Sequence, residues 1–563
     1  MKNNLYSWQE ECLRRWMAGG GRGIVEAVTG AGKTRLALEA IGALEKKYGA
    51  KLLVKIVVPT AALMRQWSKA LREFLSEAGG GLSESVAGAG ASGNESGGAA
   101  AIGPGDSRSE SAAAMGPGDD ESEGVADIGL CGGGRKASAE HKYMIYVVNS
   151  ARYTLARQIL ANLRQGRPVF LIADECHHYA SGENRLIFEF MDHMKDGSAP
   201  YHCLGLSATL PAGEARRTLV RALGPCVYSY NLKKALAART IAKYDIYHIS
   251  LNLLPKERER YNEISAYMQQ LFSKLLKARP QLRGKSSREL YEALGQLAGN
   301  GPPQISKAAT IYLKLSYQRK SLVCLAKERS LCALCLIRLL GLKEKIIVFG
   351  ERIRQAEELY QHLSADFPGR VGRYHSQMGA QANKNVLERF RNGEIRILIT
   401  CKSLDEGMDI PDVSVGIILS GTSGQRQRIQ RLGRVIRKAE GKDFASLYYL
   451  HTDQTSEDEC FLPQGGQHRI TELYFDSGHG EFYNPVYEEA ACRAFDGWCM
   501  GEENAGMNEK VRQEILRCLR LGSVRCDWEL PLKELEEKAA AARGVRERNY
   551  WICMAKVHAA REE

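Results

Sequence analysis

Two sets of short apolar runs, each alternating with amphipathic stretches, narrow the folds open to this chain more than any other feature. The first set comprises GIVEAV, KIVVPT, MIYVVN, VFLIADE and HCLGLSAT, and each run ends in a polar or glycine-rich turn. The second comprises KIIVFG, RILIT, VGIILS and SLYYL. Between the runs apolar residues recur at helical spacing, as in Leu63, Trp67, Leu71 and Phe74. Strands that alternate with helices form parallel sheets covered on both faces, so the sequence predicts two tandem α/β units.

Residues 79–140 interrupt the first set with a different composition. Gly, Ala, Ser, Asp and Glu dominate this segment, and it contains a crude repeat, AAAIGPGD followed by AAAMGPGD. Such a composition buries too little apolar surface to offset the entropy lost on ordering, so we expect a disordered insertion. Without it, the runs at 51–60 and 142–150 become consecutive, as two strands of one sheet would be. The insertion should therefore interrupt a domain without ending it.

The remaining segments complete the expected domain layout. Residues 255–341 are rich in helical patterns and lack strand patterns, and the last hundred or so residues are mostly helical in pattern. The expected parts are a first α/β domain at 1–78 and 141–245, the insertion at 79–140, a helical linker or insertion at 246–342, a second α/β domain at 343–455 and a helical accessory region at 456–563.

The composition indicates a globular protein with a weak preference for a polyanionic partner. The net charge is +12 and the pI is near 8.9, but Lys and Arg are spread along the chain rather than clustered in a tail. The fifteen cysteines show no regular spacing, which is typical of free thiols in a reducing compartment. Glu10 and Glu11 lie where a signal peptide needs an apolar core, and no apolar run reaches about 18 residues. We therefore expect a cytoplasmic protein that does not contact a membrane.

Two cysteine-containing groups lack the spacing of a zinc site. Cys332 and Cys335 lie in a Leu-rich helical run with no second pair, so we interpret them as part of a buried helix face. Cys176, His177 and His178 are adjacent on a tight turn and cannot readily converge on one ion without distant partners.

A glycine-rich loop follows the first strand and opens a helix at residues 27–34. Its glycines let backbone N–H groups approach phosphates, Lys33 can reach the β and γ phosphates, and the hydroxyl of Thr34 can ligate Mg²⁺. The alternative is an ordinary glycine-rich turn, and the first position is Ala27 where Gly is usual. The context of strand, loop and helix favours binding of ATP, with contacts from Thr29, Gly30, Ala31, Gly32, Lys33 and Thr34.

Two adjacent carboxylates, Asp174 and Glu175, end the apolar run that begins at Val169. At the carboxyl end of a strand such a pair can divide two roles, with Asp174 holding Mg²⁺ and Glu175 orienting and activating the attacking water. Alone, the pair would more often be a solvated turn. Its position downstream of a phosphate-binding loop favours the catalytic role.

Together these residues resemble the superfamily 2 helicases and translocases, over roughly residues 5–455. The resemblance implies two RecA-like domains that sandwich one nucleotide, and hence an α/β fold. It assigns coupling of ATP state to nucleic-acid grip to His177, Ser207, Ala208 and Thr209. It implies nucleic-acid contacts for Pro59, Thr60, Arg65, Asn149, Ser150, Arg152 and Thr400. It adds Gln9, as the adenine-reading amide, and Gly407, Asp409 and Gln430 to the ATP-binding residues.

A pair of arginines explains why a second domain is needed. Arg434 and Arg437 lie one helical turn apart, so both can point across a cleft at the γ-phosphate held by the first domain. Arginines in that role stabilise the charge on the transferring phosphoryl group and raise rates by about 10³ to 10⁵. The alternative is a solvated basic face of a helix. With Lys33 and Glu175, they are the expected catalytic residues.

Within the superfamily, the DECHH box, the NSARY segment and QRLGRVIR resemble the group of XPB, RadD and the type I and III restriction motors. This resemblance implies DNA rather than RNA as the partner, and a helicase or translocase acting in repair or anti-phage defence. We find no convincing nuclease site. Two alternatives stay open, an RNA-directed remodeller and a non-motor subunit that uses ATP as a switch. The C-terminal region could recruit a protein partner.

Overall fold

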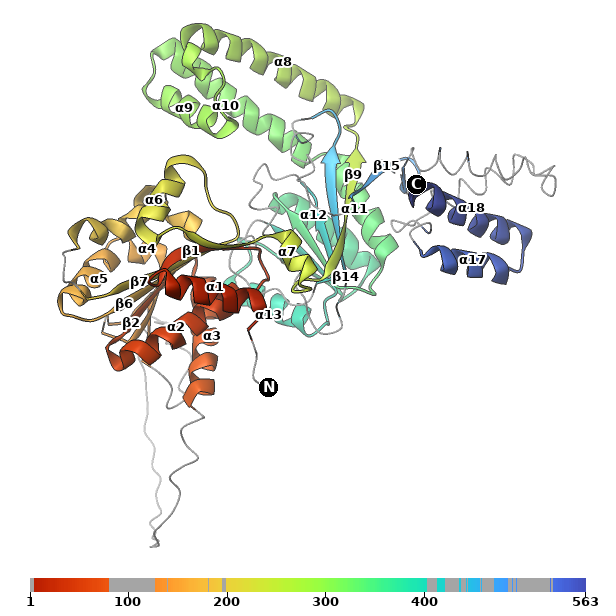
Figure 1. Ribbon diagram of the computed structural model, residues 1–563. Coiled ribbons are helices and arrows are strands. Elements are labelled where there is room, and N and C mark those ends of the chain that lie inside the picture. Colours follow the sequence, from red (N-terminus) through yellow and green to blue (C-terminus); the bar gives the residue numbers. More distant parts are fainter. Residues whose placement is uncertain are drawn as a thin grey trace, which may run out of the picture. The chain divides into compact units, whose positions relative to one another are not determined.

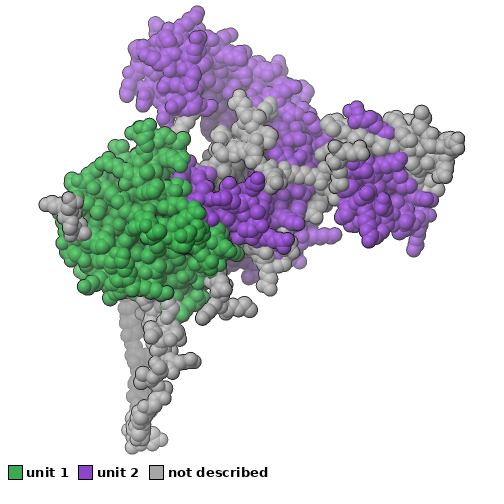
Figure 2. Space-filling view, viewed as in Figure 1, with its two compact units in different colours: residues 1–25, 34–206, 211–227 green, residues 26–33, 207–210, 228–563 purple. Residues whose placement is uncertain are grey.

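The computed structural model describes residues 5–79, 127–138, 140–180, 182–194, 199–401, 413–420, 435–436, 442, 444–455, 457, 470–484, 489, 493, 527 and 530–562. The chain divides into two compact units (Figure 2). The first holds residues 1–25, 34–206 and 211–227, and the second holds residues 26–33, 207–210 and 228–563.

Among the described residues, the first sheet has eight strands in the order β4-β3-β5-β2-β6-β7-β1-β8. Its strands are β1 (Arg22–Ala27), β2 (Leu53–Val58), β3 (Ile128–Gly132), β4 (Arg135–Lys136), β5 (Tyr143–Val147), β6 (Val169–Asp174), β7 (Tyr201–Ser207) and β8 (Cys226–Tyr230). Strands β1, β2, β6 and β7 are labelled in Figure 1. From β3 through β5, β2 and β6 to β7 every pairing is parallel, whereas β3 and β4 pair antiparallel. Four strands, β2, β5, β6 and β7, are buried along their whole length, as expected for a sheet covered on both faces.

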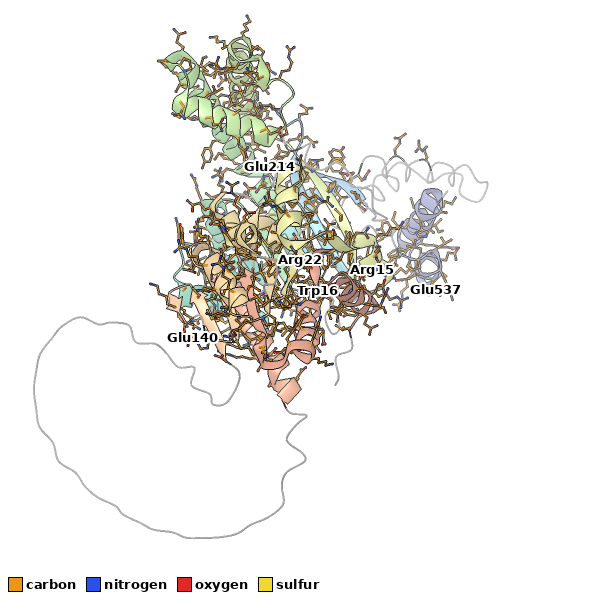
Figure 3. The ribbon with its side chains drawn as sticks, turned by 60° about the vertical axis from the view of Figure 1, so that its left-hand side comes forward. Arg15, Trp16, Arg22, Glu140, Glu214 and Glu537 are labelled. Atoms are coloured by element: carbon orange, nitrogen blue, oxygen red, sulfur yellow. The ribbon has the colours of Figure 1, made fainter. Side chains whose placement is uncertain are left out.

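The helical elements of this part follow the strands in alternation. They are α1 (Ser7–Ala18), α2 (Lys33–Tyr48), η1 (Gly49–Lys51), α3 (Ala61–Gly79), α4 (Val148–Ala151), α5 (Leu155–Arg164), η2 (Cys176–Tyr179), η3 (Gly182–His193) and α6 (Gly213–Leu223). The helix expected from Leu63, Trp67 and Leu71 is α3, and all three side chains are buried. Trp16, labelled in Figure 3, packs its ring 5.3 Å from that of Phe170 and donates its indole N–H to the carbonyl oxygen of Cys203 at 3.0 Å.

Part of the segment where we expected no regular structure is ordered. The predicted pairing of the strands at 51–60 and 142–150 is present as β2 and β5, in register from Val54↔Tyr143 to Val58↔Val147. However, β3 and β4 lie within residues 79–140, and β3 pairs with β5. At Gly132, with φ +123°, a Cβ atom would lie 2.6 Å from the Cβ of Val147. At Gly132 the absence of a side chain allows close packing of β3 against β5. We had interpreted the glycines of this segment as a sign of disorder, and for Gly132 that interpretation is wrong. Residues 80–126 lie outside the described residues.

The second sheet also has eight strands, in the order β11-β12-β10-β13-β14-β9-β15-β16. They are β9 (Lys243–Leu251), β10 (Ile346–Gly350), β11 (Val371–Tyr374), β12 (Ile397–Cys401), β13 (Val415–Ile418), β14 (Phe444–Thr452), β15 (Ile470–Asp476) and β16 (Glu481–Tyr483). All pairings are parallel except that of β15 with β16. Helices α7 (Leu232–Ala237), α11 (Lys327–Leu340), α12 (Ile353–Asp366) and α13 (Ala380–Arg391) belong to the same unit.

The second sheet extends beyond the residues we expected for it. Strand β9 crosses the expected boundary at 245/246 and pairs with β14 over nine residues, from Lys243↔Phe444 to Leu251↔Thr452. Strands β15 and β16 lie in the region that we expected to be helical. Helix α11, which we placed in the linker, contributes Cys332, Leu336 and Ile337 to the core of this sheet. Cys332 is fully buried and Cys335 partly so, in agreement with a buried helix face.

Residues 255–324 form a group of helices that we call the helical arm. It comprises α8 (Pro255–Ala278), η4 (Pro280–Leu282), α9 (Ser287–Asn300) and α10 (Pro303–Cys324). The arm has an apolar core of its own around Leu275, Leu282, Leu294 and Ala309. Arg258 ties its base to the end of β14, donating to the carbonyl oxygens of Asp453 at 2.7 Å and Gln454 at 2.9 Å. Because β9 precedes the arm and α11 follows it, the arm is an insertion within the second unit.

Near the C-terminus, α17 (Leu532–Ala541) and α18 (Val545–Glu562) pack against each other. Among the residues described, no helix combines the length and the apolar character needed to span a membrane.

Candidate active site

The glycine-rich loop follows β1 and leads directly into α2, whose first residue is Lys33. Gly30 has φ +85° and Gly32 has φ +92°, in the left-handed region where a side chain would be strained. The ammonium group of Lys33 donates to the carbonyl oxygen of Ala27 at 2.9 Å, so its charge lies over the loop. Thr34 is in the first turn of α2 and is half-buried. A loop of this shape at the start of a 16-residue helix presents backbone N–H groups and a positive charge to an anion.

Asp174 and Glu175 lie at the carboxyl end of β6. Asp174 is the last residue of a fully buried strand and is itself only 6% exposed. Glu175 adopts φ 46°, ψ 49°, a left-handed conformation that is uncommon for a residue with a side chain. Its N–H donates to Oδ1 of Asp174 at 3.0 Å. A strained residue beside a buried carboxylate is the kind of arrangement that clusters at functional sites.

Two aromatic residues, Trp67 on α3 and Tyr179 on η2, contact Asp174. The indole N–H of Trp67, a residue 1% exposed on α3, donates to Oδ2 of Asp174 at 2.8 Å. The hydroxyl group of Tyr179 lies 2.7 Å from the carbonyl oxygen of Asp174 and 3.0 Å from that of Val57. Neither residue was predicted from the sequence as part of the site. Trp67 had been interpreted only as an apolar position of a helix.

The residues expected to couple ATP state to nucleic acid follow β6 and β7. Nδ1 of His177 lies 3.4 Å from Oε2 of Glu175, and the His177 side chain is almost fully buried. Ser207 ends β7 and is fully buried; its hydroxyl donates to the carbonyl oxygen of Thr209 at 2.7 Å. This bond closes a tight turn over Ala208. The structure thus places His177 against the proposed catalytic carboxylate, and the Ser207 turn at the end of a neighbouring strand.

Gln9 occupies a position that complicates its expected role. It is 2% exposed on α1, and its side-chain oxygen accepts the N–H of Tyr6 at 2.8 Å, at the start of the helix. One acceptor site of its amide is therefore used within the helix terminus. Recognition of adenine by Gln9 stays a prediction.

The two expected nucleic-acid segments of the first domain follow adjacent strands. Pro59 and Thr60 come after β2, where the Thr60 hydroxyl accepts the N–H of Leu63 at 3.3 Å, and Arg65 is exposed on α3. The second segment, with Asn149, Ser150 and Arg152, follows β5 in and after α4. Since β5, β2 and β6 are neighbouring parallel strands, both segments lie at the sheet edge that carries Asp174.

Arg152 is engaged within the protein. Its guanidinium group donates to Oδ1 of Asn149 at 3.0 Å and forms an ion pair with Glu183. A phosphate that used Arg152 would have to compete with that carboxylate.

Thr400 does not lie where a nucleic-acid contact requires it. It is 1% exposed within β12, and its hydroxyl donates to the carbonyl oxygen of Val348 on β10 at 3.0 Å. Strand β12 continues to Cys401, so Thr400 lies within the strand and not in the turn after it. Its hydroxyl group is therefore used for a hydrogen bond inside the sheet. Gly407, Asp409, Gln430, Arg434 and Arg437 lie outside the described residues.

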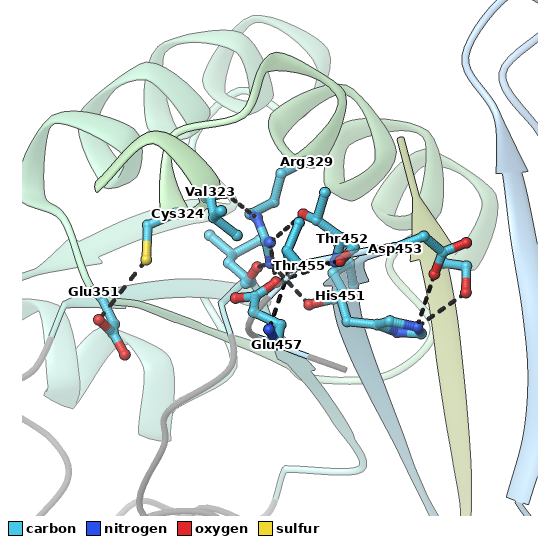
Figure 4. Close-up of polar contacts among 12 residues, drawn as sticks. Val323, Cys324, Arg329, Glu351, His451, Thr452, Asp453, Thr455 and Glu457 are labelled. Atoms are coloured by element: carbon cyan, nitrogen blue, oxygen red, sulfur yellow. Dashed lines mark hydrogen bonds and ion pairs between the residues drawn. The ribbon is translucent and has the colours of Figure 1, made fainter. Parts of the chain in front are cut away.

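Arg329 is a further residue that the sequence did not reveal (Figure 4). It is fully buried at the start of α11 and forms an ion pair with Glu457 at 2.5 Å. It also donates to the carbonyl oxygens of Leu419, after β13, and of Leu450, on β14, the latter at 2.8 Å. Arg329 therefore fastens together the carboxyl ends of two central strands of the second sheet.

Among the described residues, no group of three or more His, Cys, Asp and Glu side chains is arranged to hold a metal ion. Asp174 and Thr34 nevertheless have the oxygen donors that Mg²⁺ uses when phosphate oxygens supply the other ligands. The buried carboxylate at the end of β6 has both oxygens oriented by hydrogen bonds, from Trp67 and from the backbone of Glu175.

Two mostly parallel sheets, with a glycine-rich phosphate loop after β1 and a carboxylate pair after β6, define a nucleotide-binding protein with two tandem RecA-like domains. Residues 2–212 match the family described as type III restriction enzyme, res subunit, and residues 326–439 match the helicase conserved C-terminal domain. The chain belongs to helicase superfamily 2 and is a nucleic-acid-dependent ATPase of the helicase type.

Individual relatives agree with this assignment. The chain is 26% identical over 442 residues to the DNA 3'-5' translocase XPB2 of Sulfurisphaera tokodaii, covering 78% of this chain and 80% of that protein. It is 27% identical over 154 residues to UvrABC system protein B of Thermosynechococcus vestitus, a match that covers 26% of this chain and 22% of the relative. In fold it is similar to the ATP-dependent type ISP restriction-modification enzyme LlaBIII bound to DNA, with a TM-score of 0.50 at 13% identity, over 97% of this chain and 35% of that one.

Proposed function

We propose that the protein is a DNA-stimulated ATPase that translocates on or unwinds DNA. The observation that carries the proposal is the arrangement at the end of β6, where buried Asp174 precedes Glu175 in a left-handed conformation. In the same sheet only β7 separates β6 from β1, the strand that precedes the phosphate loop. This order supports the proposal that Asp174 binds the metal ion and Glu175 acts as general base, because both residues then lie two strands from the phosphate loop.

In this proposal the loop at 27–34 holds the triphosphate, with Lys33 donating to its β and γ phosphates. Thr34 and Asp174 would hold Mg²⁺, which neutralises charge on the phosphate oxygens when it is bound. Glu175 orients a water molecule and accepts its proton. Arg434 and Arg437, from the second RecA-like domain, complete the site, and hydrolysis then changes the grip of the two domains on the strand.

Nucleic acid is proposed to run along the sheet edge formed by the ends of β2 and β5. The segments with Thr60 and Arg65 and with Asn149 and Ser150 follow these strands, next to Asp174. DNA is favoured over RNA because the long match is to a DNA translocase and a fold neighbour is a restriction enzyme bound to DNA. A role in repair or anti-phage defence fits the same relatives.

The test is a titration of the ATPase rate with single-stranded DNA, duplex DNA and matched RNA duplex. We expect strong stimulation by DNA, and loss of turnover in Lys33→Ala, Glu175→Gln and Arg434→Ala. Glu175→Gln should still bind ATP, because it leaves the phosphate loop intact. Glu214→Gln is the matched control, since it neutralises an exposed carboxylate on α6 of the same unit, labelled in Figure 3.

Each of the other outcomes identifies a different function. Greater stimulation by RNA would replace the DNA motor with an RNA remodeller. ATP binding without turnover in the wild-type protein would indicate an ATP-dependent switch. Turnover that no nucleic acid raises would contradict the motor proposal.

A further inference from the structure

We infer that Trp67 is a positioning residue that couples the nucleic-acid segment at the start of α3 to the carboxylate of Asp174. The inference rests on the proposed function, in which residues 59–65 contact a strand and Asp174 holds Mg²⁺. It assigns a role to a side chain that touches neither the nucleotide nor the nucleic acid in that proposal.

The first step is the hydrogen bond itself. Trp67 and Asp174 are 107 residues apart, both are buried, and the indole N–H lies 2.8 Å from Oδ2. An indole nitrogen is only a donor, so the bond has one possible direction. The other carboxylate oxygen accepts the N–H of Glu175 at 3.0 Å. One donor thus comes from α3 and the other from the turn that carries the proposed base, and together they fix the plane of the carboxylate.

The second step is the position of Trp67 on its helix. Residues 59 and 60 lead into α3, and the Thr60 hydroxyl accepts the N–H of Leu63 within the first turn. Arg65 is exposed, whereas Trp67, two residues later, is 1% exposed. One short helical segment therefore presents a cation to solvent on one side and the hydrogen-bond donor to Asp174 on the other. Any shift of this segment that a bound strand causes moves the donor.

The third step is a second link on the other side of the same segment. Tyr179 places its hydroxyl 3.0 Å from the carbonyl oxygen of Val57, at the end of β2, and 2.7 Å from that of Asp174. The proposed strand-contacting segment is thus joined to Asp174 at both of its ends, by Tyr179 before it and by Trp67 after it. The Tyr179 link reaches the backbone carbonyl of Asp174, so of these two links it is the one from Trp67 that acts on the carboxylate.

The decisive variant is Trp67→Phe, which keeps an aromatic ring in the core and removes only the N–H donor and one ring. Trp16→Phe is the matched control. Trp16 is equally buried in the same unit and also donates its indole N–H, but to the backbone of Cys203. Both variants lose one buried hydrogen bond, so their thermal unfolding and circular dichroism report the structural cost that they share.

The first measurement is the affinity for a fluorescent ATP analogue, with Mg²⁺ and with EDTA, in the absence of DNA. In EDTA we expect Trp67→Phe to bind the analogue with wild-type affinity. The increase in affinity caused by Mg²⁺ should be about tenfold smaller in this variant than in the wild type, because a hydrogen bond to a charged group contributes at least that factor. Trp16→Phe should keep the full gain. A normal Mg²⁺ gain in Trp67→Phe would overturn the positioning of Asp174.

The second measurement is the change in DNA affinity caused by a non-hydrolysable ATP analogue. Coupling between two ligands is reciprocal, so the ratio of DNA dissociation constants with and without the analogue reports it. Trp67→Phe should bring this ratio close to one without altering DNA affinity in the absence of nucleotide. An unchanged ratio would overturn the coupling role. Absence of coupling in the wild-type protein would instead contradict the proposed function, and the Mg²⁺ measurement would still decide the role of Trp67.

If Trp67→Phe unfolds, benzothienylalanine at position 67 replaces it. That side chain keeps both fused rings and exchanges only the N–H for sulfur. Loss of the Mg²⁺ gain in this protein supports the inference, and its retention contradicts it.

Discussion

Lys55 is a charged residue inside the first sheet, and its burial there lowers its pKa. It lies in the middle of β2, fully buried, between Met144 of β5 and Leu171 of β6 in the register of the sheet. Burial, and to a lesser degree the positive charge of Arg167, lower the pKa of Lys55 to about 8 from an ordinary value of 10.5. The folded state therefore releases this proton at a lower pH than the unfolded chain does.

Replacing Lys55 by Met should change the pH dependence of stability. Between about pH 8 and 10.5 the unfolded chain binds more protons than the folded chain, so this lysine makes wild-type stability rise with pH. The Lys55→Met variant has no titrating group at this position. Its free energy of unfolding, relative to that of the wild type, should therefore fall by about 2 kcal/mol between pH 7 and pH 9.5. Urea denaturation at the two pH values measures the difference. A constant difference would mean that Lys55 is not held with a lowered pKa.

The sequence predicted those candidate site residues whose positions depend on neighbours in the chain. Lys33 begins the helix after the glycine-rich loop and Asp174 ends a buried strand, so the order of loop, strand and carboxylates was sufficient to single them out with Glu175. Trp67 and Tyr179 were missed because their partners are decided by the packing of α3 and η2 onto β6. A tryptophan at an apolar helical position carries no sign of what its nitrogen contacts.

Among the elements, α11 is joined to the ends of two strands by a buried ion pair in addition to its apolar packing. Arg329, near its start, reaches the ends of β13 and β14 and pairs with Glu457, whose carboxylate also accepts the N–H of Thr452 at 3.1 Å. Removal of one partner of a buried pair leaves the other charge without compensation, which costs several kcal/mol.

We expect Arg329→Met to destabilise the second unit by about 3 to 5 kcal/mol in equilibrium unfolding. Arg338→Gln is the control, because Arg338 lies on the same helix but its pair with Asp366 is half-exposed, and it should cost less than about 1 kcal/mol. The double variant Arg329→Met, Glu457→Leu should recover part of the loss. Equal effects of Arg329→Met and Arg338→Gln would show that the buried pair does not hold the strand ends.

Elements were predicted well where a run is apolar throughout and poorly where its partner is remote. The strands at 346–350 and 397–401 were evident, because central strands of a parallel sheet are continuous apolar runs. Strand β9 alternates polar and apolar residues and pairs with a strand about two hundred residues later. Strand β3 is short and glycine-rich. Neither pairing has a local signal.

For the molecule as a whole, the boundaries of the helical arm show that much of the net positive charge lies in one inserted segment. The helical arm, residues 255–324, contains thirteen Lys and Arg and five Glu, so it carries +8 of the chain's net +12. Exposed lysines recur on its helices, with Lys274 and Lys277 on α8 and Lys307 and Lys314 on α10. Such a surface attracts a polyanion and makes binding dependent on salt.

Neutralising these four lysines with Gln should weaken DNA binding and reduce its salt dependence. A plot of log affinity against log salt concentration has a negative slope. Each lost phosphate contact makes this slope less steep by about 0.9 for duplex DNA. ATPase activity without DNA should not change. The control variant loses the same number of positive charges from the first unit. It has Gln in place of four exposed lysines, Lys46, Lys51, Lys69 and Lys136. An effect of the control as large as that of the arm variant, measured by fluorescence anisotropy over a salt series, would argue against the arm.

The order of strands in the second sheet has a consequence for proteolysis. Strand β9 lies between β14 and β15 but precedes the arm in the chain, whereas every other strand of that sheet follows it. A protease that cuts between α8 and α9 would thus produce two polypeptides that share one hydrogen-bonded sheet. They should migrate as one species in a native gel and separate only in denaturant, because parting them requires the amino-terminal fragment to withdraw its strand from the interior of the other.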